Sequence, residues 1–562
     1  MKRSFSRKTV QVVLSLALLL TAAAPLQPAH AAAAAERPVL VGLVYGSGAA
    51  PGGNVLNDVG TGYRFGYLDG ERSFVTLGWT DETAVSVVKT ENVFFGGPLA
   101  NGFKGYSDQI TSSVAVGCYH IQVPGSYESF EETAAAAAEV PGGFPAWING
   151  TYCVRTGAYL NGADASAAMA ALGIEGAIIR GTSEYATSVV RTGTDTVLFQ
   201  FDGMKELALT LMPGLDDSVQ TRTWFLGKKY YGGFQFRRVN GGNLTIASVV
   251  DPSDYISCVI SQEMSEGWPL EALKAQAVAA RSYCSTNTGR HVANQFDICA
   301  TTHCQAYYGC FGAGENTDRA ARETAGEYLK YNGKVAEAFY YSSNGGASEN
   351  SENVWSESIP YLRGVVDPYE ADVAGSISGY NWTRSFTGEQ LQAKLSSAGY
   401  TRCGTIRSAT IKKTPTGNVY SITFQDVNGK SWTISKESCR IVLGLNSMRF
   451  DLDGAVPDTP AGPGGGPLYV IGSDGSVSQI TGAYYVLGED GSAVQSGTAG
   501  DTAPSNTTGG TVTPAGGVFT FRGSGLGHNV GMSQWGAYAM AKRGLTYRDI
   551  LTFYYTGASI ES

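Results

Sequence analysis

Breaker-rich segments divide this chain of 562 residues and limit which of its parts can pack together. Gly, Pro, Ser and Thr dominate "GAVPDTPAGPGGGP" and "GTAGDTAPSNTTGGTVTPAGG", both within 451–517. Such compositions favour linkers, and the chain exceeds the size of one compact core. We therefore expect several domains, a hairpin-like insert between the two linkers, and a final block at 518–562 that packs back onto the main domain because it has too little core of its own.

The N-terminus has the three parts of an export signal. A basic head, "MKRSFSRK", precedes an apolar run of about 15 residues and the small-x-small sequence "AHA". This pattern predicts a signal peptide at 1–31 and an exported protein that is extracellular or associated with the cell wall. An uncleaved N-terminal membrane anchor is the alternative, although the run is short for a full span.

Charge and composition narrow the class of ligand. The net charge is −9 and only 16% of residues are charged, which excludes the basic stripe that nucleic-acid binding requires. With 73 Gly and 31 Tyr, the surface is expected to be uncharged, aromatic and rich in hydroxyl groups. Sugars suit such a surface, because their rings stack on aromatic faces and their hydroxyl groups form neutral hydrogen bonds.

The alternation of apolar runs and turns predicts a multidomain α+β protein. Short β-like runs separated by Gly-rich turns fill a β-rich N-terminal region at 36–117. A weak repeat follows, "YHIQVPGSYESFEETAAAAA" and "YCVRTGAYLNGADASAAMAAL", each a strand, a turn and an Ala-rich helix. It predicts a small α/β module at 118–180 that resembles the SPOR domain, which binds peptidoglycan glycan stripped of its peptides. A plain βαβ repeat is the alternative.

The stretch "SQEMSEGWPLEALKAQAVAARSYC" holds three acids around a Trp-Pro step. Glu263 follows the apolar run "YISCVI" and precedes Met264, so we expect it to emerge from a buried element near Trp268. A carboxyl group in such a place is partly desolvated, which raises its pKa and keeps it protonated near neutral pH. A general acid that protonates a glycosidic oxygen needs this property. Glu263 is the candidate catalytic residue, and a structural acid is the alternative.

The other two acids of this stretch have structural interpretations. Pro269 suits the first turn of a helix, where Glu271 favours the helix dipole. Apolar residues recur at a spacing of three or four along this helix and form one face: Leu270, Leu273, Ala277 and Cys284. Glu266, next to Gly267, is interpreted as a solvated turn residue.

Four stretches, in order, closely resemble motifs of the SpoIID/LytB family, the stage II sporulation protein D and amidase-enhancer group. They are the stretch around Glu263, "DICATTHCQAYYG", "YYSSNGGASENSENVW" with "IPYLRGVVDPY", and "GSGLGHNVGMSQWGA". The resemblance predicts a SpoIID catalytic domain at 225–450 that is completed by 518–562. One departure is visible: the family usually has Gly-His-Gly near the end, whereas Asn529 follows His528 here, which puts in doubt only the local turn geometry.

The resemblance implies an enzyme, a lytic transglycosylase acting on denuded peptidoglycan strands in sporulation or cell-wall remodelling. Glu263 takes the position of the family's catalytic glutamate. In that chemistry one acid protonates the oxygen between N-acetylmuramic acid and N-acetylglucosamine. It then accepts a proton from the muramic 6-hydroxyl, which closes a 1,6-anhydro ring, so no second carboxylate is required, unlike in a paired-carboxylate hydrolase.

Soft and borderline metal ligands gather within 14 residues of one another: His291, Cys299, His303 and Cys304. This set suits tetrahedral Zn²⁺, and the resemblance implies a zinc ion in some members. Because four protein ligands leave no position for water, we expect structural zinc and no organic cofactor. The alternatives are buried thiols with a core histidine, or a disulfide with Cys310. Disulfides between Cys118 and Cys153 or between Cys403 and Cys439 are also left open.

Two motifs are expected to line the glycan cleft. "YYSSNGG" combines aromatic and hydroxyl side chains with a Gly turn, and "GSGLGHNVGMSQWGA" lacks the Lys-Ser/Thr ending of a phosphate loop. The candidate substrate contacts are Trp268, Tyr341, Ser342, Ser343, Gly345, Gly346, His528 and Gln534. The alternatives are a strand that ends in a turn and a histidine that caps a turn.

Two further functions compete with the lyase. One is a non-catalytic peptidoglycan-binding amidase enhancer, whose partners would be glycan strands and a cell-wall amidase. The other is a zinc hydrolase, which the absence of an HExxH motif from the sequence disfavours.

Overall fold

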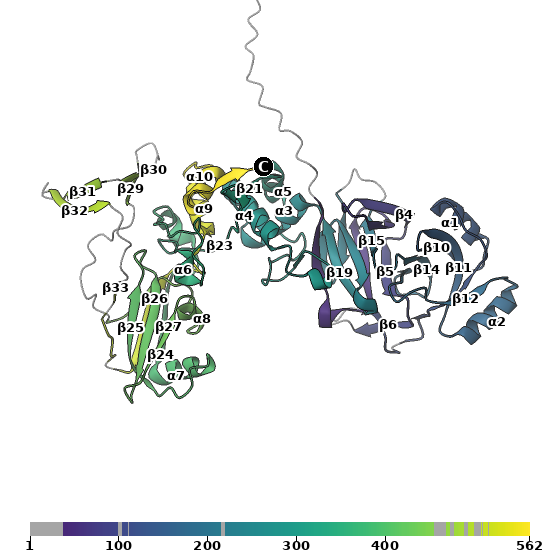
Figure 1. Cartoon of the computed structure of the whole chain (residues 1–562), viewed down its shortest axis with the longest axis horizontal. Coiled ribbons are helices and arrows are strands. Elements are labelled where there is room, and N and C mark those ends of the chain that lie inside the picture. Colours follow the sequence, from purple (N-terminus) through teal and green to yellow (C-terminus); the bar gives the residue numbers. More distant parts are fainter. Residues whose placement is uncertain are drawn as a thin grey trace, which may run out of the picture. The chain divides into compact units, whose positions relative to one another are not determined.

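The computed structural model describes residues 37–98, 104–110, 112–214, 220–454, 510–514 and 516–562, together with five short strands between 468 and 508. The predicted signal peptide and most of the predicted linkers lie outside these residues. Helices and strands are mixed along the chain (Figure 1), which confirms the α+β class. Within the described residues no helix combines the length and the apolar character needed to cross a bilayer.

A seven-stranded sheet joins N-terminal strands to strands that lead into the Glu263 region. Its order is β20-β1-β19-β18-β15-β3-β4, with β1 antiparallel to β19 and parallel to β20. The bounds are β20 Ile298–Cys299, β1 Val39–Val44, β19 Leu244–Val250, β18 Gly233–Arg238, β15 Leu209–Pro213, β3 Tyr63–Leu68 and β4 Phe74–Thr80. The predicted division between 36–117 and 225–450 therefore cuts through one hydrogen-bonded sheet.

A ten-stranded sheet has the order β12-β9-β11-β10-β14-β13-β5-β2-β16-β17. The bounds are β12 Ala177–Arg180, β9 Tyr119–Gln122, β11 Thr151–Tyr159, β10 Gly143–Ile148, β14 Val197–Asp202, β13 Thr187–Arg191, β5 Ala84–Lys89, β2 Gly52–Val59, β16 Arg222–Phe225 and β17 Lys228–Tyr231. A separate small sheet holds β6 Val93–Pro98, β7 Lys104–Ser107 and β8 Ala115–Val116.

The predicted α/β module forms one end of the ten-stranded sheet. Its elements run β9, α1 (Phe130–Ala138), β10, β11, α2 (Gly162–Leu172) and β12, and the four strands have the antiparallel order of a split βαβ unit. Ser129 and Asn161 cap the two helices through their side chains. The SPOR interpretation stays a prediction, because one fold serves many functions.

Five helices surround the Glu263 region: α3 (Pro252–Glu263), α4 (Leu270–Asn287), α5 (Glu315–Glu323), α9 (Gln534–Lys542) and α10 (Tyr547–Tyr554). Pro252 occupies the first turn of α3, and the Asp251 side chain accepts a hydrogen bond from Ser253 N. Helix α4 is buried on nearly all sides, because its Ala residues allow neighbouring helices to approach closely.

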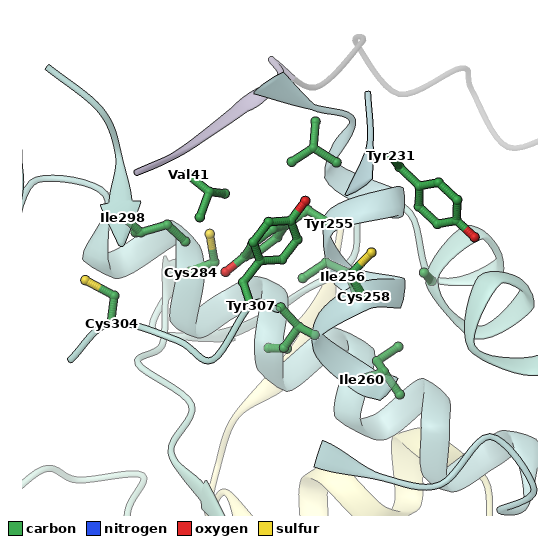
Figure 2. Close-up of a cluster of buried hydrophobic side chains, with 14 of the residues drawn as sticks. Val41, Tyr231, Tyr255, Ile256, Cys258, Ile260, Cys284, Ile298, Cys304 and Tyr307 are labelled. Carbon is green, nitrogen blue, oxygen red and sulfur yellow. The ribbon is translucent and has the colours of Figure 1, made fainter. Parts of the chain in front are cut away.

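Aromatic and aliphatic side chains from α3 and α4 form the core of this region (Figure 2). Tyr255 of α3 and Tyr307 are fully buried, with their ring centroids 5.2 Å apart, and Val41 of β1 and Ile298 of β20 lie beside them. This core therefore depends on the N-terminal strand β1.

The remaining elements include a second hydrophobic core around 382–452 and 512–521. Short strands pair as β21 Tyr328–Tyr331 with β22 Lys334–Val335 and β36 Ser559–Glu561, and as β23 Tyr340–Tyr341 with β35 Met532–Ser533. The second core is built from β24 Asn381–Thr387, α7 Gly388–Ser397, β25 Ile406–Lys413, β26 Val419–Asp426, β27 Ser431–Ser435, α8 Ser438–Ile441, β28 Phe450–Leu452 and β34 Val518–Ser524. Short helices are α6 Ser351–Val354 and the 3-10 helices η1 Gly46–Gly48, η2 Val239–Gly241, η3 Val292–Asn294 and η4 Glu370–Ser376.

The predicted hairpin-like insert contains two antiparallel strand pairs, β29 Leu468–Ile471 with β30 Val477–Ile480 and β31 Gly482–Leu487 with β32 Ala493–Ala499. β33 Thr507–Thr508 pairs with β25. All nine cysteines lie within the described residues, and each is buried and free of a disulfide.

Candidate active site

Glu263 is the last residue of α3. Met264, which follows it, is extended (φ −133°, ψ 151°) and buried. The chain therefore leaves the helix immediately after Glu263, and the carboxyl group lies half-buried at the helix end. This position agrees with the expectation that Glu263 emerges from a buried element.

The C-terminal block supplies the partner of Glu263. Strand β35 lies parallel to β23, with Tyr341 opposite Ser533. Ser533 caps α9 through its side chain, so Gln534 begins the helix. From there Gln534 Nε2 donates a hydrogen bond to Glu263 Oε2 at 2.8 Å. Two segments 271 residues apart thus meet at one carboxylate.

The surroundings of Glu263 favour its protonated form. Burial raises the pKa of this carboxyl group above its ordinary value, and the hydrogen bond from Gln534, which lowers the pKa, only partly offsets the effect. A raised pKa leaves a larger fraction of Glu263 able to donate a proton near neutral pH, as a general acid requires.

Glu263 opens into a pocket of about 180 Å³. The lining residues are Glu263, Tyr283, Thr302, Cys304, Gln305, Ala306, Phe339, Tyr340 and His528. Glu263 is the one carboxylate in this lining. The pocket is smaller than the roughly 300–1,000 Å³ typical of sites that enclose a whole ligand, so it can hold only one part of a longer molecule.

A hydrogen-bonded chain of side chains orients the pocket wall. The Tyr255 hydroxyl donates to Gln305 Oε1 at 2.6 Å, and Gln305 Nε2 donates to the Tyr340 hydroxyl at 3.0 Å. Because the Gln305 amide is held on both sides, the Tyr340 hydroxyl keeps a hydrogen available to donate toward the pocket. The interaction of Tyr340 with Glu263 also contributes to the raised pKa of that phenol, after burial.

Tyr340, rather than the predicted Tyr341, is the tyrosine of "YYSSNGG" that lines the pocket. Adjacent residues of a strand point to opposite sides, and in β23 it is Tyr341 that is buried in the protein interior. Two other pocket residues were not predicted: Gln305 lies inside the motif "DICATTHCQAYYG", and Phe339 directly precedes "YYSSNGG". Alternation along extended backbone indicates that only one of the two tyrosines can face the pocket, but it does not show which one.

The rest of the predicted cleft loop is anchored beneath the surface. The Ser343 hydroxyl donates to Glu370 Oε1 at 2.6 Å, and Gly345 N donates to the same atom at 3.0 Å. The Ser533 hydroxyl donates to Glu370 Oε2 at 2.5 Å. Ser342 and Gly346 are half-buried and also absent from the pocket lining. As placed, this loop positions Ser533 and its neighbour Gln534 instead of presenting its own side chains to the pocket.

His528 lines the pocket and also stabilises a turn. Its Nδ1 accepts a hydrogen bond from Val530 N at 3.1 Å, so Nε2 carries the hydrogen and donates to Tyr340 O at 3.1 Å. Burial lowers the pKa of His528 to about 4. A neutral ring with two backbone partners therefore shapes the wall beside Tyr340 and stabilises the turn, while a contact of His528 with substrate stays a prediction. Asn529, where the family usually has Gly, has a φ of 65°.

Trp268 is absent from the pocket lining and belongs to an aromatic cluster with two residues of α9, the helix that begins at Gln534. Its ring centroid lies 4.7 Å from that of Trp535 and 4.8 Å from that of Tyr538. All three rings are half-buried. Trp535 and Tyr538 were not among the predicted residues, although "SQWGAY" contains both.

The four predicted metal ligands converge, with their ligand atoms within 4.8 Å of one another. Cys304 Sγ lies 3.3 Å from His291 Nε2 and 3.5 Å from His303 Nδ1, and Cys299 Sγ lies 3.7 Å from His303 Nδ1. Ligands around tetrahedral Zn²⁺, with bonds of about 2.0–2.3 Å, are separated by roughly 3.3–3.8 Å. The distances and the donor set fit a zinc ion.

The environment of the cluster also favours metal binding. Burial alone would raise the pKa of the Cys299 thiol, but hydrogen bonds from Thr301 and His303 outweigh it and bring the pKa to about 5. The thiolate is the form that binds metal. The Phe296 ring stacks on His291 at 4.7 Å and fixes its orientation. Cys304 belongs both to this cluster and to the lining of the Glu263 pocket.

Glu266 and Glu271, the other two acids in the stretch that leads into α4, have structural partners. Glu266 was predicted to be a solvated turn residue, and this is wrong: its carboxylate accepts hydrogen bonds from Asn316 N at 2.6 Å and Thr317 N at 3.0 Å. It thereby satisfies free N–H groups at the start of α5. Glu271 lies in the first turn of α4 as predicted, and it accepts a hydrogen bond from Tyr547 N at 2.9 Å.

Known proteins show similarity to the part of the chain that carries this site. The family model described as SpoIID, stage II sporulation protein, matches residues 240–331. An amidase enhancer of Bacillus subtilis (strain 168) is 32% identical over 319 residues, which are 54% of this chain and 40% of that protein. Stage II sporulation protein D of the same organism is 28% identical over 322 residues, which are 55% of this chain and 73% of that protein.

The match with the amidase enhancer thus spans less than half of that relative's length. The matched family segment nevertheless contains Glu263, all of α4 and all four ligands of the metal cluster. Through this segment and the curated relatives, the chain is similar to proteins of the SpoIID/LytB family.

Proposed function

We propose that this protein is an exported lytic transglycosylase that cleaves peptide-free peptidoglycan strands during sporulation or cell-wall remodelling. The observation that carries the proposal is a single half-buried carboxyl group, Glu263, with a raised pKa in a pocket whose lining contains no second carboxylate. The sporulation-protein and amidase-enhancer names of the relatives support a cell-wall role.

In the proposed reaction Glu263 acts first as an acid. Its proton passes to the oxygen between N-acetylmuramic acid and N-acetylglucosamine, and the bond from that oxygen to the muramic C1 breaks. The resulting carboxylate then accepts the proton of the muramic 6-hydroxyl, whose oxygen bonds to C1. The product is a 1,6-anhydro ring, and Glu263 ends protonated, so one carboxylate suffices.

The neighbouring residues support both steps. The hydrogen bond from Gln534 holds Glu263 in place and partly stabilises the carboxylate formed in the first step. The pocket accommodates one sugar at the reacting centre, while Trp268 and Trp535 offer aromatic faces for stacking. The Tyr340 hydroxyl, oriented by Gln305, can donate to a sugar oxygen.

Mass spectrometry of peptide-free glycan strands incubated with the protein tests the proposal. The wild type should generate anhydro-muramic ends. Glu263→Gln should lower the rate by about 10²–10⁴-fold, the contribution of a general acid, and leave glycan binding nearly unchanged. Glu315→Gln is a matched control, because Glu315 is exposed in the first turn of α5. Reducing ends would indicate a hydrolase, and a Glu263→Gln variant with full activity would contradict the assignment.

A non-catalytic amidase enhancer is the second candidate, favoured by the name of one relative. In that function the aromatic cluster and the α/β module would bind glycan, and a cell-wall amidase would be the partner. Intact strands after incubation, together with faster peptide removal by an added amidase, would support it over the lyase.

We also propose that the His/Cys cluster binds one structural zinc ion, which would cross-link the segment 291–304. Elemental analysis of protein purified without chelator should find about one zinc per chain. Cys304→Ser should lose the metal and lower Tm, since such sites contribute directly to folding. Protein that contains no zinc as purified, or whose Tm does not change when a chelator is added, would contradict this proposal.

A further inference from the structure

A second concavity lies next to the Glu263 pocket, with a volume of about 790 Å³. It lies between the β16–β17 hairpin and the segment 308–313, and we call it the hairpin groove. Its lining residues are Arg222, Trp224, Gly227, Lys228, Lys229, Gln262, Tyr308, Cys310, Phe311, Gly312 and Ala313. A backbone hydrogen bond of 2.8 Å from Cys310 N to Lys229 O ties its two sides together.

The hairpin groove and the Glu263 pocket share two segments. Gln262 lines the groove and Glu263 lines the pocket, in the last turn of α3. Ala306 lines the pocket and Tyr308 the groove, only two positions apart, or roughly 7 Å along extended backbone. Gln262 Nε2 also donates to Phe311 O at 2.7 Å. A linear polymer with one unit at Glu263 is therefore within reach of the groove.

Aromatic side chains are unusually exposed in the hairpin groove. Phe311 is 81% exposed, Tyr308 40% and Trp224 36%. Clustered apolar side chains at a protein surface mark binding sites. Flat aromatic faces beside a concavity suit the apolar faces of sugar rings.

Positively charged side chains line the same groove as these aromatic rings. Arg222 and Lys229 both pair with Asp58, at 3.2 and 3.0 Å. Lys228 is exposed, lies 4.4 Å from the centre of the Tyr308 ring, and has no acidic partner in the described part of the chain. Three cations and one acid leave a local charge of +2 on a chain with a net charge of −9. The groove therefore favours an anionic ligand.

We propose that the hairpin groove binds an acidic sugar polymer, with aromatic rings stacking on its sugars and Lys228 pairing with its carboxylates. The identity of the polymer rests on the proposed function: in a peptide-free strand each muramic acid carries a free lactyl carboxylate. In a strand that retains its peptides this carboxylate is part of an uncharged amide. The groove thus offers a cation to the free lactyl carboxylate of a peptide-free strand.

Binding assays on the Glu263→Gln protein test the groove separately from catalysis. The two probes are a peptide-free glycan oligomer and an N-acetylglucosamine oligomer of equal length, which has no carboxylate. Adding Lys228→Gln should weaken binding of the acidic oligomer about 2- to 5-fold, as for an exposed ion pair, and flatten its salt dependence. Binding of the neutral oligomer should not change.

A second variant and a control complete the test. Phe311→Ser should weaken binding of both oligomers, because it removes a stacking surface, and Lys334→Gln, a change at an exposed lysine of β22, should affect neither. Equal losses for both oligomers with Lys228→Gln, or no loss with either groove variant, would overturn the proposal. If binding follows the expected pattern but the wild-type protein leaves the glycan strands intact, the groove proposal is supported and the lyase proposal is contradicted.

Discussion

Glu263 has a raised pKa because it is half-buried at the position where α3 ends. A carboxyl group one turn earlier would lie among the buried residues of α3, and one at the position of Ser265, two residues later, would be exposed. Its half-buried position was predictable from the apolar run before it. Its partner Gln534 belonged to a quoted motif, but no local pattern shows which of its atoms faces Glu263.

The pH dependence of stability follows from the raised pKa of Glu263. Because the ionised form is disfavoured in the folded protein, the stability that Glu263 contributes is complete below its unfolded pKa. It is lost as the pH rises through the higher folded pKa. Glu263→Gln removes this loss, so its Tm relative to wild type should increase from pH 4 to pH 8. A difference that decreases with pH in thermal unfolding scans would contradict the assignment.

Gln534→Leu should change the pH profile of the reaction. It removes the hydrogen bond that lowers the pKa of Glu263, so that pKa should rise and the alkaline limb of the rate profile should shift to higher pH. The maximum rate should fall as well, because the carboxylate loses a stabilising donor. A lower rate with an unshifted profile would show that Gln534 acts only on structure.

Helix α5 shows how an element can depend on a residue far away in the sequence. Its N-cap position is Gly314, which has no side chain to accept a hydrogen bond, and Glu266 supplies the acceptor from 50 residues away. Local sequence patterns can predict α4, because its helix-start signals lie in one stretch. They cannot predict that Glu266 caps α5. Tyr341 was predicted to line the pocket instead of Tyr340 for a similar reason: a two-residue strand gives too little periodicity to show which residue faces which side.

Replacing Glu266 should destabilise the protein without changing the chemistry. Glu266→Ala removes both acceptors at the start of α5 and should cost about 1–2 kcal/mol of unfolding free energy, in the range measured for helix caps. Glu315→Ala, in the same helical turn but exposed, should cost less. Denaturant unfolding measures both, and equal losses would mean that Glu266 is not the cap.

Long-range strand pairing connects the parts of the chain that sequence reasoning separated. β1 lies between β19 and β20, and the Arg72 guanidinium forms an ion pair with Asp297 at 2.6 Å. The α+β class and the returning C-terminal block could be predicted from alternating patterns and breakers. The shared sheets could not, since pairing partners leave no local signal.

A fragment that begins at residue 225 should therefore fold poorly. It would lose β1 from the edge of β19, as well as Val41 from the core around Tyr255. We expect aggregation or rapid proteolysis, whereas a chain from 37 to 562 should resist both. Limited proteolysis with circular dichroism compares the two, and a fragment as stable as the longer chain would show that β1 is dispensable.

Because 271 residues separate Glu263 from Gln534, the proposed active site is completed only late in synthesis of the polypeptide. While the ribosome is still adding α9, the acid is present but lacks the amide that holds it. A chain interrupted before that point would carry the Glu263 motif without the Gln534 amide that holds the carboxylate in place.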